Sequence, residues 1–348
     1  MKSIFPFSIK TWQWFFFAKP FTFKKTFFAL IYGWHAIWFE INCWLSKQTH
    51  RKEFSNSISS SIFICGLWRT GSTEVHRLLA QLPGVDTPRT WQCMAASTFS
   101  LTGSPKDIVS LKRPMDSQLI DALSPQEDEF ALLSFGVDSC YRGFFEPERL
   151  SELQYCLDPE FWLANNDWFE TFEKFLFSVI RTKSTPLVKS PNHSFRLKSI
   201  FKNAPDSKVV WLVRDPVDTY YSNKKMWLKM METYSFGKVD SNVLDDFLIS
   251  SFNEIANVLY WATENIPKDK MMIVAFRDLC VSPNIVLKTI CSQLNLLSDA
   301  QEISKIVDLI DFNPIVESRY VSSSRSSKLE AAISALAIAQ ERAVLYFG

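Results

Sequence analysis

Glycine and histidine are scarce in this sequence of 348 residues, and its cysteines follow no motif spacing. The four histidines show no metal-ligand spacing, so we expect no metal site. The seven cysteines include no C-x-x-C pair, which favours reduced thiols in an intracellular, cytoplasmic protein. The net charge is only +1, and bulk electrostatics therefore give no argument for a nucleic-acid partner.

Acidic residues are absent from positions 1–39, whereas five lysines and many aromatic residues are present there. From Phe27 to Leu45 apolar residues recur at helical spacing. Two interpretations stay open: an amphipathic helix packed on the protein, or residues 1–45 in peripheral contact with a membrane. No small-residue cleavage site follows, which argues against a signal peptide. We expect 1–57 to be an aromatic-rich helical extension with a linker, and 58–348 to be one α/β domain.

Strand-like and helix-like segments alternate along the rest of the chain. The apolar runs predict buried strands at 61–65, 185–191, 207–216 and 270–276. Helices are predicted at 72–82, 124–135, 158–180, 216–232, 282–294 and 326–346, and 88–125 is expected to be irregular. This alternation predicts a three-layer α/β fold in which helices flank a central parallel sheet.

The stretch "GLWRTGST", residues 66–73, lies between a predicted strand and a predicted helix. It fits the phosphate-binding pattern G-x-x-x-x-G-K-[ST], except that Ser72 replaces the lysine. A loop entering a helix N-terminus points backbone N–H groups at one spot and favours an anion. Arg69 offers a cationic fork for a single phosphate. The pattern alone predicts either an anion site or a simple tight turn.

A second signal follows the strand "VVWLV". Arg214 lies at the end of this strand, and Ser222 follows eight residues later. Open α/β sheets bind ligands at the carboxyl ends of their strands. Arg214 and the loop at 66–73 therefore belong to the same edge of the predicted sheet.

With both signals in place, the sequence resembles the sulfotransferases that use 3′-phosphoadenosine 5′-phosphosulfate (PAPS), and most of all their bacterial-type branch. "GLWRTGST" is similar to the family's P-loop-like 5′-phosphosulfate loop, and "LVRDPVDTYYS" to its 3′-phosphate motif. "VHRLLAQLPGVDTPRTWQ", "PQEDEFALL", "PLVKSPNH" and "FRDLCVSP" resemble further stretches of that branch. The resemblance covers about residues 60–295.

The resemblance implies that PAPS is the co-substrate and that no Mg²⁺ is needed. It implies donor binding by a set of loop, strand-end and helix residues. These are Arg69, Thr70, Gly71, Ser72, Thr73, Arg214 and Ser222. PAPS has no γ-phosphate, so the lysine of an ATP-binding loop would have nothing to reach.

For catalysis, we expect Arg69 and Lys189 to stabilise the charge that develops on the leaving phosphate. The resemblance places a glutamate as general base where this sequence has Gln92, and an amide accepts no proton at neutral pH. His193 is our leading substitute, although it can also be a structural histidine. The acids at 127–129 are further candidates, or else partners of a helix dipole.

Alternatives to the transferase are a non-catalytic nucleotide- or anion-binding protein on the same fold and a P-loop nucleotide kinase. The acceptor group is expected to be a hydroxyl or an amine, and the acceptor itself stays open among a small alcohol, a sugar, a lipid and a peptide tyrosine. The aromatic content of 88–180 favours an apolar or sugar acceptor, since aromatic walls suit both.

Overall fold

Five parallel strands form the central sheet of this computed structural model, in the order β2-β5-β1-β6-β7. The strands are β1 (Ile62–Cys65), β2 (Val85–Asp86), β5 (Thr185–Lys189), β6 (Lys208–Val213) and β7 (Met271–Ala275). A separate antiparallel hairpin joins β3 (Leu111–Lys112) to β4 (Leu119–Ile120). The structure describes residues 8–16, 33–45, 60–105, 110–116, 118–180, 184–235, 237–296, 300–309 and 325–348. The expected parallel α/β architecture is confirmed.

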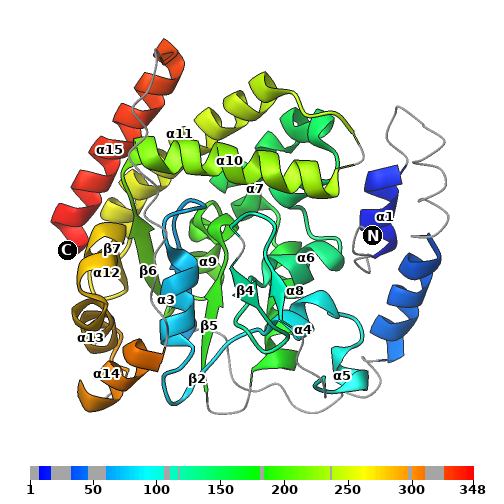
Figure 1. Ribbon diagram of the computed structural model, residues 1–348, viewed down its shortest axis with the longest axis horizontal. Coiled ribbons are helices and arrows are strands. Elements are labelled where there is room, and N and C mark those ends of the chain that lie inside the picture. The colour runs from blue at the N-terminus through cyan, green and yellow to red at the C-terminus, as the bar shows by residue number, and fades with distance from the viewer. Residues whose placement is uncertain are drawn as a thin grey trace.

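Helices cover both faces of the sheet (Figure 1). Phe63 and Cys65 of β1 enter the larger core, whereas Ile62 and Ile64 enter the smaller one. Successive side chains of a strand point to opposite faces, so a strand covered on both sides is apolar throughout. This is why the buried strands could be recognised as continuous apolar runs.

The larger core receives side chains from η2, η3, α7–α11 and α15, and the smaller core from α3 and α12–α14. The bounds are α1 (Ile9–Phe16), α3 (Ser72–Leu79), α4 (Thr90–Met94), α5 (Phe99–Thr102), α6 (Glu129–Ser134), η2 (Cys140–Phe144), η3 (Pro147–Leu157), α7 (Pro159–Ala164), α8 (Asp167–Val179), η4 (Pro191–Ser194), α9 (Leu197–Asn203), α10 (Pro216–Tyr234), α11 (Ser241–Asn265), α12 (Phe276–Val281), α13 (Pro283–Gln293), α14 (Ala300–Leu309) and α15 (Ser327–Phe347). A further helix spans 33–45. Within the described ranges, no helix has the length and apolar character needed to cross a bilayer.

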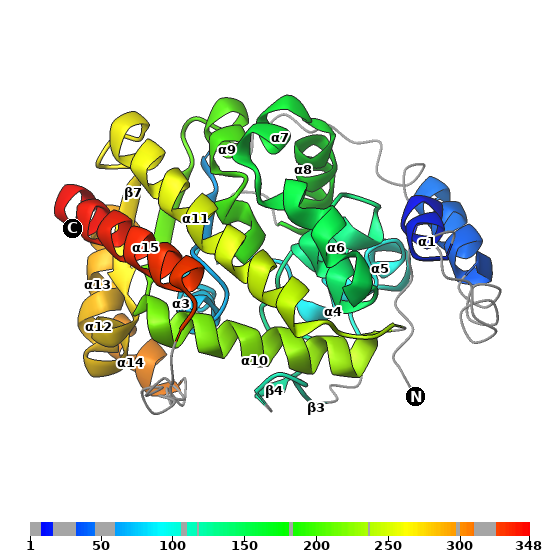
Figure 2. The same cartoon turned by 90° about the horizontal axis from the view of Figure 1, so that it is seen from above.

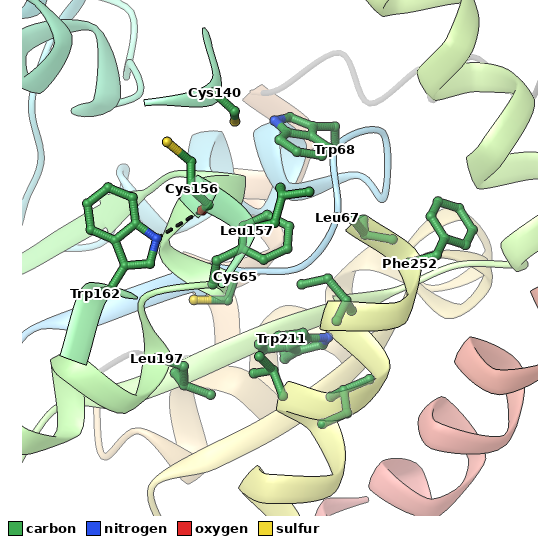
Figure 3. Close-up of a cluster of buried hydrophobic side chains, with 14 of the residues drawn as sticks. Cys65, Leu67, Trp68, Cys140, Cys156, Leu157, Trp162, Leu197, Trp211 and Phe252 are labelled. Atoms are coloured by element: carbon green, nitrogen blue, oxygen red, sulfur yellow. Dashed lines mark hydrogen bonds between the residues drawn. The ribbon is translucent and has the colours of Figure 1, made fainter. Parts of the chain in front are cut away.

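Sulfur and indole side chains lie together in the larger core (Figure 3). Cys65, Cys140 and Cys156 are buried there, and the indole N–H of Trp162 donates to the carbonyl oxygen of Cys156 at 2.9 Å. No disulfide joins any of the seven cysteines. Burial raises the pKa of the Cys65 thiol, which therefore stays protonated and behaves as a small apolar side chain.

Two predicted helices differ from the observed ones. The segment 158–180 is broken between α7 and α8, because the Asn165 amide donates to the Phe161 carbonyl at 2.7 Å and Asn165 leaves the helical region. The helix predicted at 124–135 begins only at Glu129. Pro125 is instead bridged to Arg89, and a turn at 121–124 precedes it. The stretch 88–125, expected to be irregular, holds α4, α5 and the β3–β4 hairpin.

The N-terminal helices lie beside α5 and α6, at the opposite end of the molecule from α15 (Figure 2). The backbone N–H of Ser8 donates to the carbonyl of Ser134 at 2.8 Å, and Phe39 packs against Phe135 with ring centroids 5.6 Å apart. The linker predicted at 46–57 lies outside the described residues.

Candidate active site

The turn that leaves β1 begins at a glycine that no other residue can replace without strain. Gly66 has φ +129°, and a Cβ there would lie 2.6 Å from the carbonyl oxygen of Leu212 in β6. The Ser194 hydroxyl accepts from the Gly66 N–H at 2.7 Å and donates to its carbonyl at 3.0 Å. The turn is therefore fixed between β6 and η4.

The turn ends at Gly71, which caps α3. Gly71 has φ +92°, and a Cβ there would meet the Phe276 ring at 2.5 Å. The Thr70 hydroxyl donates back to the Leu67 carbonyl at 2.7 Å and so closes the turn. The first N–H groups of α3, from Ser72 onward, have no intrahelical partners and suit an anion.

Arg69 has a backbone conformation that is rare for a residue with a side chain. Its φ is +67°, a left-handed conformation that costs a non-glycine residue about 1–2 kcal/mol. In this conformation its Nε donates to the Ser222 hydroxyl at 3.3 Å and its Nη1 to the Asp116 carboxylate at 2.9 Å. Strain of this kind is tolerated where the position of a side chain matters.

Arg214 lies next to Arg69 at the end of β6. Its Nη1 donates to the Arg69 carbonyl oxygen at 3.1 Å, and its guanidinium carbon lies 4.6 Å from the centre of the Phe276 ring. With Ser222 contributed by α10, three residues named from the sequence meet at one place. Their convergence gives the carboxyl edge of the sheet two cations and a hydroxyl group.

Lys189 ends β5 and is almost fully buried. Its Nζ lies 2.5 Å from Oε1 of Glu127 and 3.5 Å from the Thr73 hydroxyl. Burial lowers the pKa of the Lys189 ammonium, although the neighbouring Glu127 carboxylate acts in the opposite direction. The strand order places β1 between β5 and β6, so Lys189 and Arg214 flank the loop from either side.

Glu127 is held by a chain of hydrogen bonds. Its Oε2 accepts from the Tyr141 hydroxyl at 2.7 Å, and the Tyr141 oxygen accepts from the indole N–H of Trp68 at 3.1 Å. Burial and the adjacent Glu127 charge raise the pKa of the Tyr141 hydroxyl well above its usual value, so it donates as a neutral group. The Glu127 carboxylate is therefore oriented by two different partners, Lys189 and Tyr141.

These groups line a cavity of about 420 Å³. Its cationic and polar part comprises Arg69, Gly71, Ser72, Thr73, Lys189 and Arg214, and Glu127 also lines it. α6, η2 and α10 contribute apolar walls, among them Phe130, Phe144, Phe145, Met226 and Met230. The cavity therefore brings an anion-binding loop and an apolar chamber into one space.

The β3–β4 hairpin covers part of this cavity and is attached to the loop helix. Asp116 of the hairpin pairs with Arg69, and Gln118 donates to the Glu74 carboxylate in α3 at 2.7 Å. Arg113 supports the same carboxylate, with its Nη2 3.4 Å from Asp116 Oδ2. The hairpin therefore places a carboxylate at Arg69, where an anionic ligand would also bind.

Three consecutive acids each pair with a different base. Glu127 pairs with Lys189, Asp128 with His193 at 2.8 Å, and Glu129 with Arg196 at 2.6 and 3.0 Å. The last two pairs have no exposed side-chain surface. Burial alone would raise the pKa of Glu129, but Arg196 outweighs it and holds that pKa below its usual value. Only the first of the three pairs faces the cavity.

The structure does not bring His193 or Gln92 to the cavity. The His193 ring is fully buried and lies edge-on to Phe63 and Phe172, with ring centroids 5.4 and 5.5 Å away. Gln92 accepts the Arg89 N–H at 2.8 Å and so caps α4. Neither residue is among those that line the cavity. The general-base role expected of His193 therefore stays a prediction for a residue outside the cavity, whereas Glu127, another candidate acid, lines the cavity.

Sequence reasoning missed several residues of this site. Tyr141 and Asp116 come from irregular segments with no motif, and nothing in their neighbours indicates a role. Phe276 opens the stretch "FRDLCVSP", which resembles the sulfotransferase family but gave no role for this residue. The described part of the chain contains no cluster of three or more His, Cys, Asp or Glu side chains able to hold a metal ion.

Comparison with known proteins gives consistent results. Residues 61–299 match the model of the sulfotransferase family. The omega-hydroxy-beta-dihydromenaquinone-9 sulfotransferases Stf3 of Mycobacterium bovis and Mycobacterium tuberculosis are each 30% identical over 243 residues, which is 68% of this chain and 62% of theirs. The aligned part is thus less than two thirds of those relatives' length.

Two solved structures share the fold. Sulfotransferase STF9 from Mycobacterium avium aligns with a TM-score of 0.67 and 17% identity, over 86% of this chain and 81% of that one. STF1 from Mycobacterium tuberculosis H37Rv aligns with a TM-score of 0.58 and 16% identity, over 90% and 85%. At these identities the likeness concerns the fold.

Proposed function

The chain belongs to the sulfotransferase family, and from that premise we propose that it transfers a sulfuryl group from PAPS to the hydroxyl of an apolar, lipid-like acceptor. One observation carries the proposal. The Lys189–Glu127 pair lies between the anion-binding loop and the apolar walls of a single cavity. A cation for the departing phosphate and a base for the incoming hydroxyl are therefore adjacent, where both substrates would meet.

The loop and its neighbours fit the donor. Arg214 and Ser222 would hold the 3′-phosphate, and Arg69 with the N–H groups of residues 70–73 would hold the 5′-phosphosulfate. The two glycines of the turn allow the close backbone approach that phosphate binding requires. Gly71, Ser72 and Thr73 line the cavity, whereas the Thr70 hydroxyl is turned back to Leu67. Thr70 would therefore contribute its backbone N–H alone.

Catalysis would depend on positioning and charge. The donor supplies an activated sulfuryl group, and transfer of such a group proceeds in line through a loose transition state. Glu127 would accept the acceptor proton while the new O–S bond forms and the S–O bond to the 5′-phosphate breaks. Arg69 and Lys189 would stabilise the negative charge that develops on the phosphate oxygen.

The walls of the cavity favour an apolar acceptor. Phenylalanine and methionine side chains from three elements line it, and such surfaces gain free energy by excluding water from hydrocarbon. The Mycobacterium relatives are named for a hydroxylated menaquinone, a long apolar molecule with a terminal hydroxyl. An amphiphile with one free hydroxyl group satisfies both observations better than a free sugar does.

The test is direct transfer of ³⁵S from labelled PAPS to a panel of acceptors. We expect product with long-chain and polyprenyl alcohols and little with monosaccharides. Binding measurements should show a thermal shift with adenosine 3′,5′-bisphosphate and none with ATP-Mg²⁺. Donor binding without transfer to any acceptor would instead favour a non-catalytic binding protein. A shift with ATP-Mg²⁺ alone would favour the kinase alternative.

A further inference from the structure

The helix over 33–45 has two apolar faces, one of which is exposed. Ala36, Phe39 and Asn42 form the buried face and are at most 5% exposed. The opposite face is formed by large apolar side chains that are 41–72% exposed: Trp34, Ile37, Trp38, Ile41, Trp44 and Leu45. We call these six residues the docking face.

The docking face is a continuous stripe. At about 100° per residue, its six positions fall within an arc of about 120° on one side of the helix. A surface helix of a water-soluble protein normally has charged and polar residues on that side. Large exposed apolar patches of this kind mark places where a protein meets a partner or a membrane.

The helix is held on the body of the protein rather than projecting freely. Glu40 accepts the N–H of Ile9 at 3.2 Å, which ties it to α1. The Thr11 hydroxyl of α1 donates to the carbonyl of Leu133 in α6 at 2.9 Å. Together with the contact between Phe39 and Phe135, these bonds leave the docking face pointing outward.

The charge of this region selects one type of partner. The first 39 residues contain five lysines and no acid, and Lys10 of α1 is exposed. Tryptophan prefers the boundary between water and hydrocarbon, and lysine near an anionic membrane contributes about 1 kcal/mol.

We propose that the docking face binds the surface of a lipid bilayer with anionic headgroups. The indole rings of Trp34, Trp38 and Trp44 would lie at the headgroup level, and the isoleucines between them would reach the first methylenes. The inference does not depend on the proposed sulfuryl transfer, because it follows from exposure and charge alone.

The position of the docking face relative to the cavity gives it a use. Thr11 of α1 donates to the carbonyl of Leu133, and Ser8, just before α1, donates to that of Ser134; both acceptor residues line the cavity. A membrane bound at the docking face would therefore lie about one helix diameter, roughly 10 Å, from the wall that α6 contributes. An apolar acceptor could then reach the cavity without crossing much water.

Vesicle flotation tests the proposal on the full chain. Vesicles of phosphatidylcholine with 30 mol% phosphatidylglycerol are compared with phosphatidylcholine alone. We expect the triple variant Trp34→Ser/Trp38→Ser/Trp44→Ser to float at least ten-fold less with the anionic vesicles. A matched control is Ile338→Ser/Val344→Ser/Leu345→Ser, which removes three exposed apolar residues from α15 at the opposite end. The control should float like the wild type.

A second measurement needs no variant. Bilayers that contain brominated acyl chains should quench part of the tryptophan fluorescence of the wild type, and high salt should reduce that quenching. Equal flotation of wild type and triple variant, or no quenching, would overturn the proposal. It would also be overturned if light scattering showed a dimer that the triple variant dissociates while neither form floats, since the face would then join two copies.

Discussion

Arg69 and Asp116 form an ion pair between the anion-binding loop and the β3–β4 hairpin, with Nη1 2.9 Å from Oδ2. An incoming phosphosulfate must therefore compete with a carboxylate for the same guanidinium. We predict that Asp116→Asn tightens binding of adenosine 3′,5′-bisphosphate several-fold, because the competing charge is removed. Isothermal titration calorimetry measures this change in affinity. Weaker binding in the variant would mean that Asp116 orients Arg69 rather than competing for it.

Glu127→Gln should lower turnover by about 10²–10⁴, the usual loss when a general base is removed. Donor affinity should change little, since in the proposed mechanism Glu127 acts on the acceptor. The decisive comparison uses two acceptors. A phenol, with a pKa near 10, needs a base less than an aliphatic alcohol does. The variant should therefore lose much less activity with the phenol, and equal losses with both acceptors would argue against proton abstraction by Glu127.

The pH dependence of the reaction rate should show the ionisation of the Lys189 ammonium. Burial lowers the pKa of its ammonium below the usual 10.5, against the opposing effect of Glu127. Because the charged form stabilises the transition state, activity should fall as the pH rises through this lowered pKa, that is, below 10.5. The unfolded chain keeps this proton up to a higher pH, so the contribution of Lys189 to stability rises over the same window. Over this pH window activity should fall while the contribution of Lys189 to stability rises, so unfolding does not explain the loss of activity.

The matched variant for that profile is Lys189→Arg. A guanidinium stays charged over the whole range, so any remaining activity of this variant should lack the basic decline. Rates measured at saturating donor from pH 6 to pH 10 give the comparison. A decline at the same pH in both proteins would assign it to another group.

Arg214→Ala should weaken adenosine 3′,5′-bisphosphate strongly and adenosine 5′-phosphate little, because only the former has the 3′-phosphate. A charged hydrogen bond contributes about 1.5–3 kcal/mol, or about 10- to 150-fold in affinity. Arg277→Ala is the control, since Arg277 is an exposed arginine nearby in α12. Equal weakening of both ligands in Arg214→Ala would place this arginine elsewhere on the donor.

His193→Ala should reduce stability rather than act on catalysis directly. It leaves the buried Asp128 carboxylate without its partner and opens a cavity among aromatic rings. A buried polar group left without its hydrogen-bond partner costs about 1–3 kcal/mol, and the cavity adds to that cost. His193→Asn, which keeps a donor for Asp128, should recover part of the melting temperature. If His193→Ala melts like the wild type but is inactive, the histidine has the catalytic role that we first expected.

The sequence predicted the strands of the sheet better than the helices and loops around the sheet. Strands covered on both faces are apolar throughout, and β1, β5, β6 and β7 could therefore be recognised; β2 has only two residues and could not. The break at Asn165 was hidden by the aromatic periodicity on either side of it. The hydrogen bond from the Asn165 side chain to the Phe161 carbonyl ends the first helix. A count of apolar positions does not detect such a bond.

In the candidate site, too, residues at strand ends could be predicted, and residues positioned by packing could not. Lys189 ends β5, Arg214 directly follows β6 and Arg69 lies in the loop after β1. The carboxyl ends of parallel strands meet at one edge, so these positions could be predicted. Asp116 and Tyr141 lie in segments whose path depends on packing, so no local pattern predicts them. His193 lies only four residues after Lys189, but the turn of η4 directs its side chain inward. Such a direction cannot be read from spacing.

The three successive pairs of an acidic and a basic side chain fix the register between two segments that are distant in the sequence. The acids at 127–129 are matched one by one with Lys189, His193 and Arg196, so a single insertion in either segment would shift every partner and leave buried charges unmatched. A one-residue insertion before Glu127 should therefore lower the melting temperature sharply, whereas a segment from a relative that keeps the three acids in register should be tolerated. Homologous recombination that preserves the fold would therefore have to keep the three acids of one segment in register with the three basic side chains of the other.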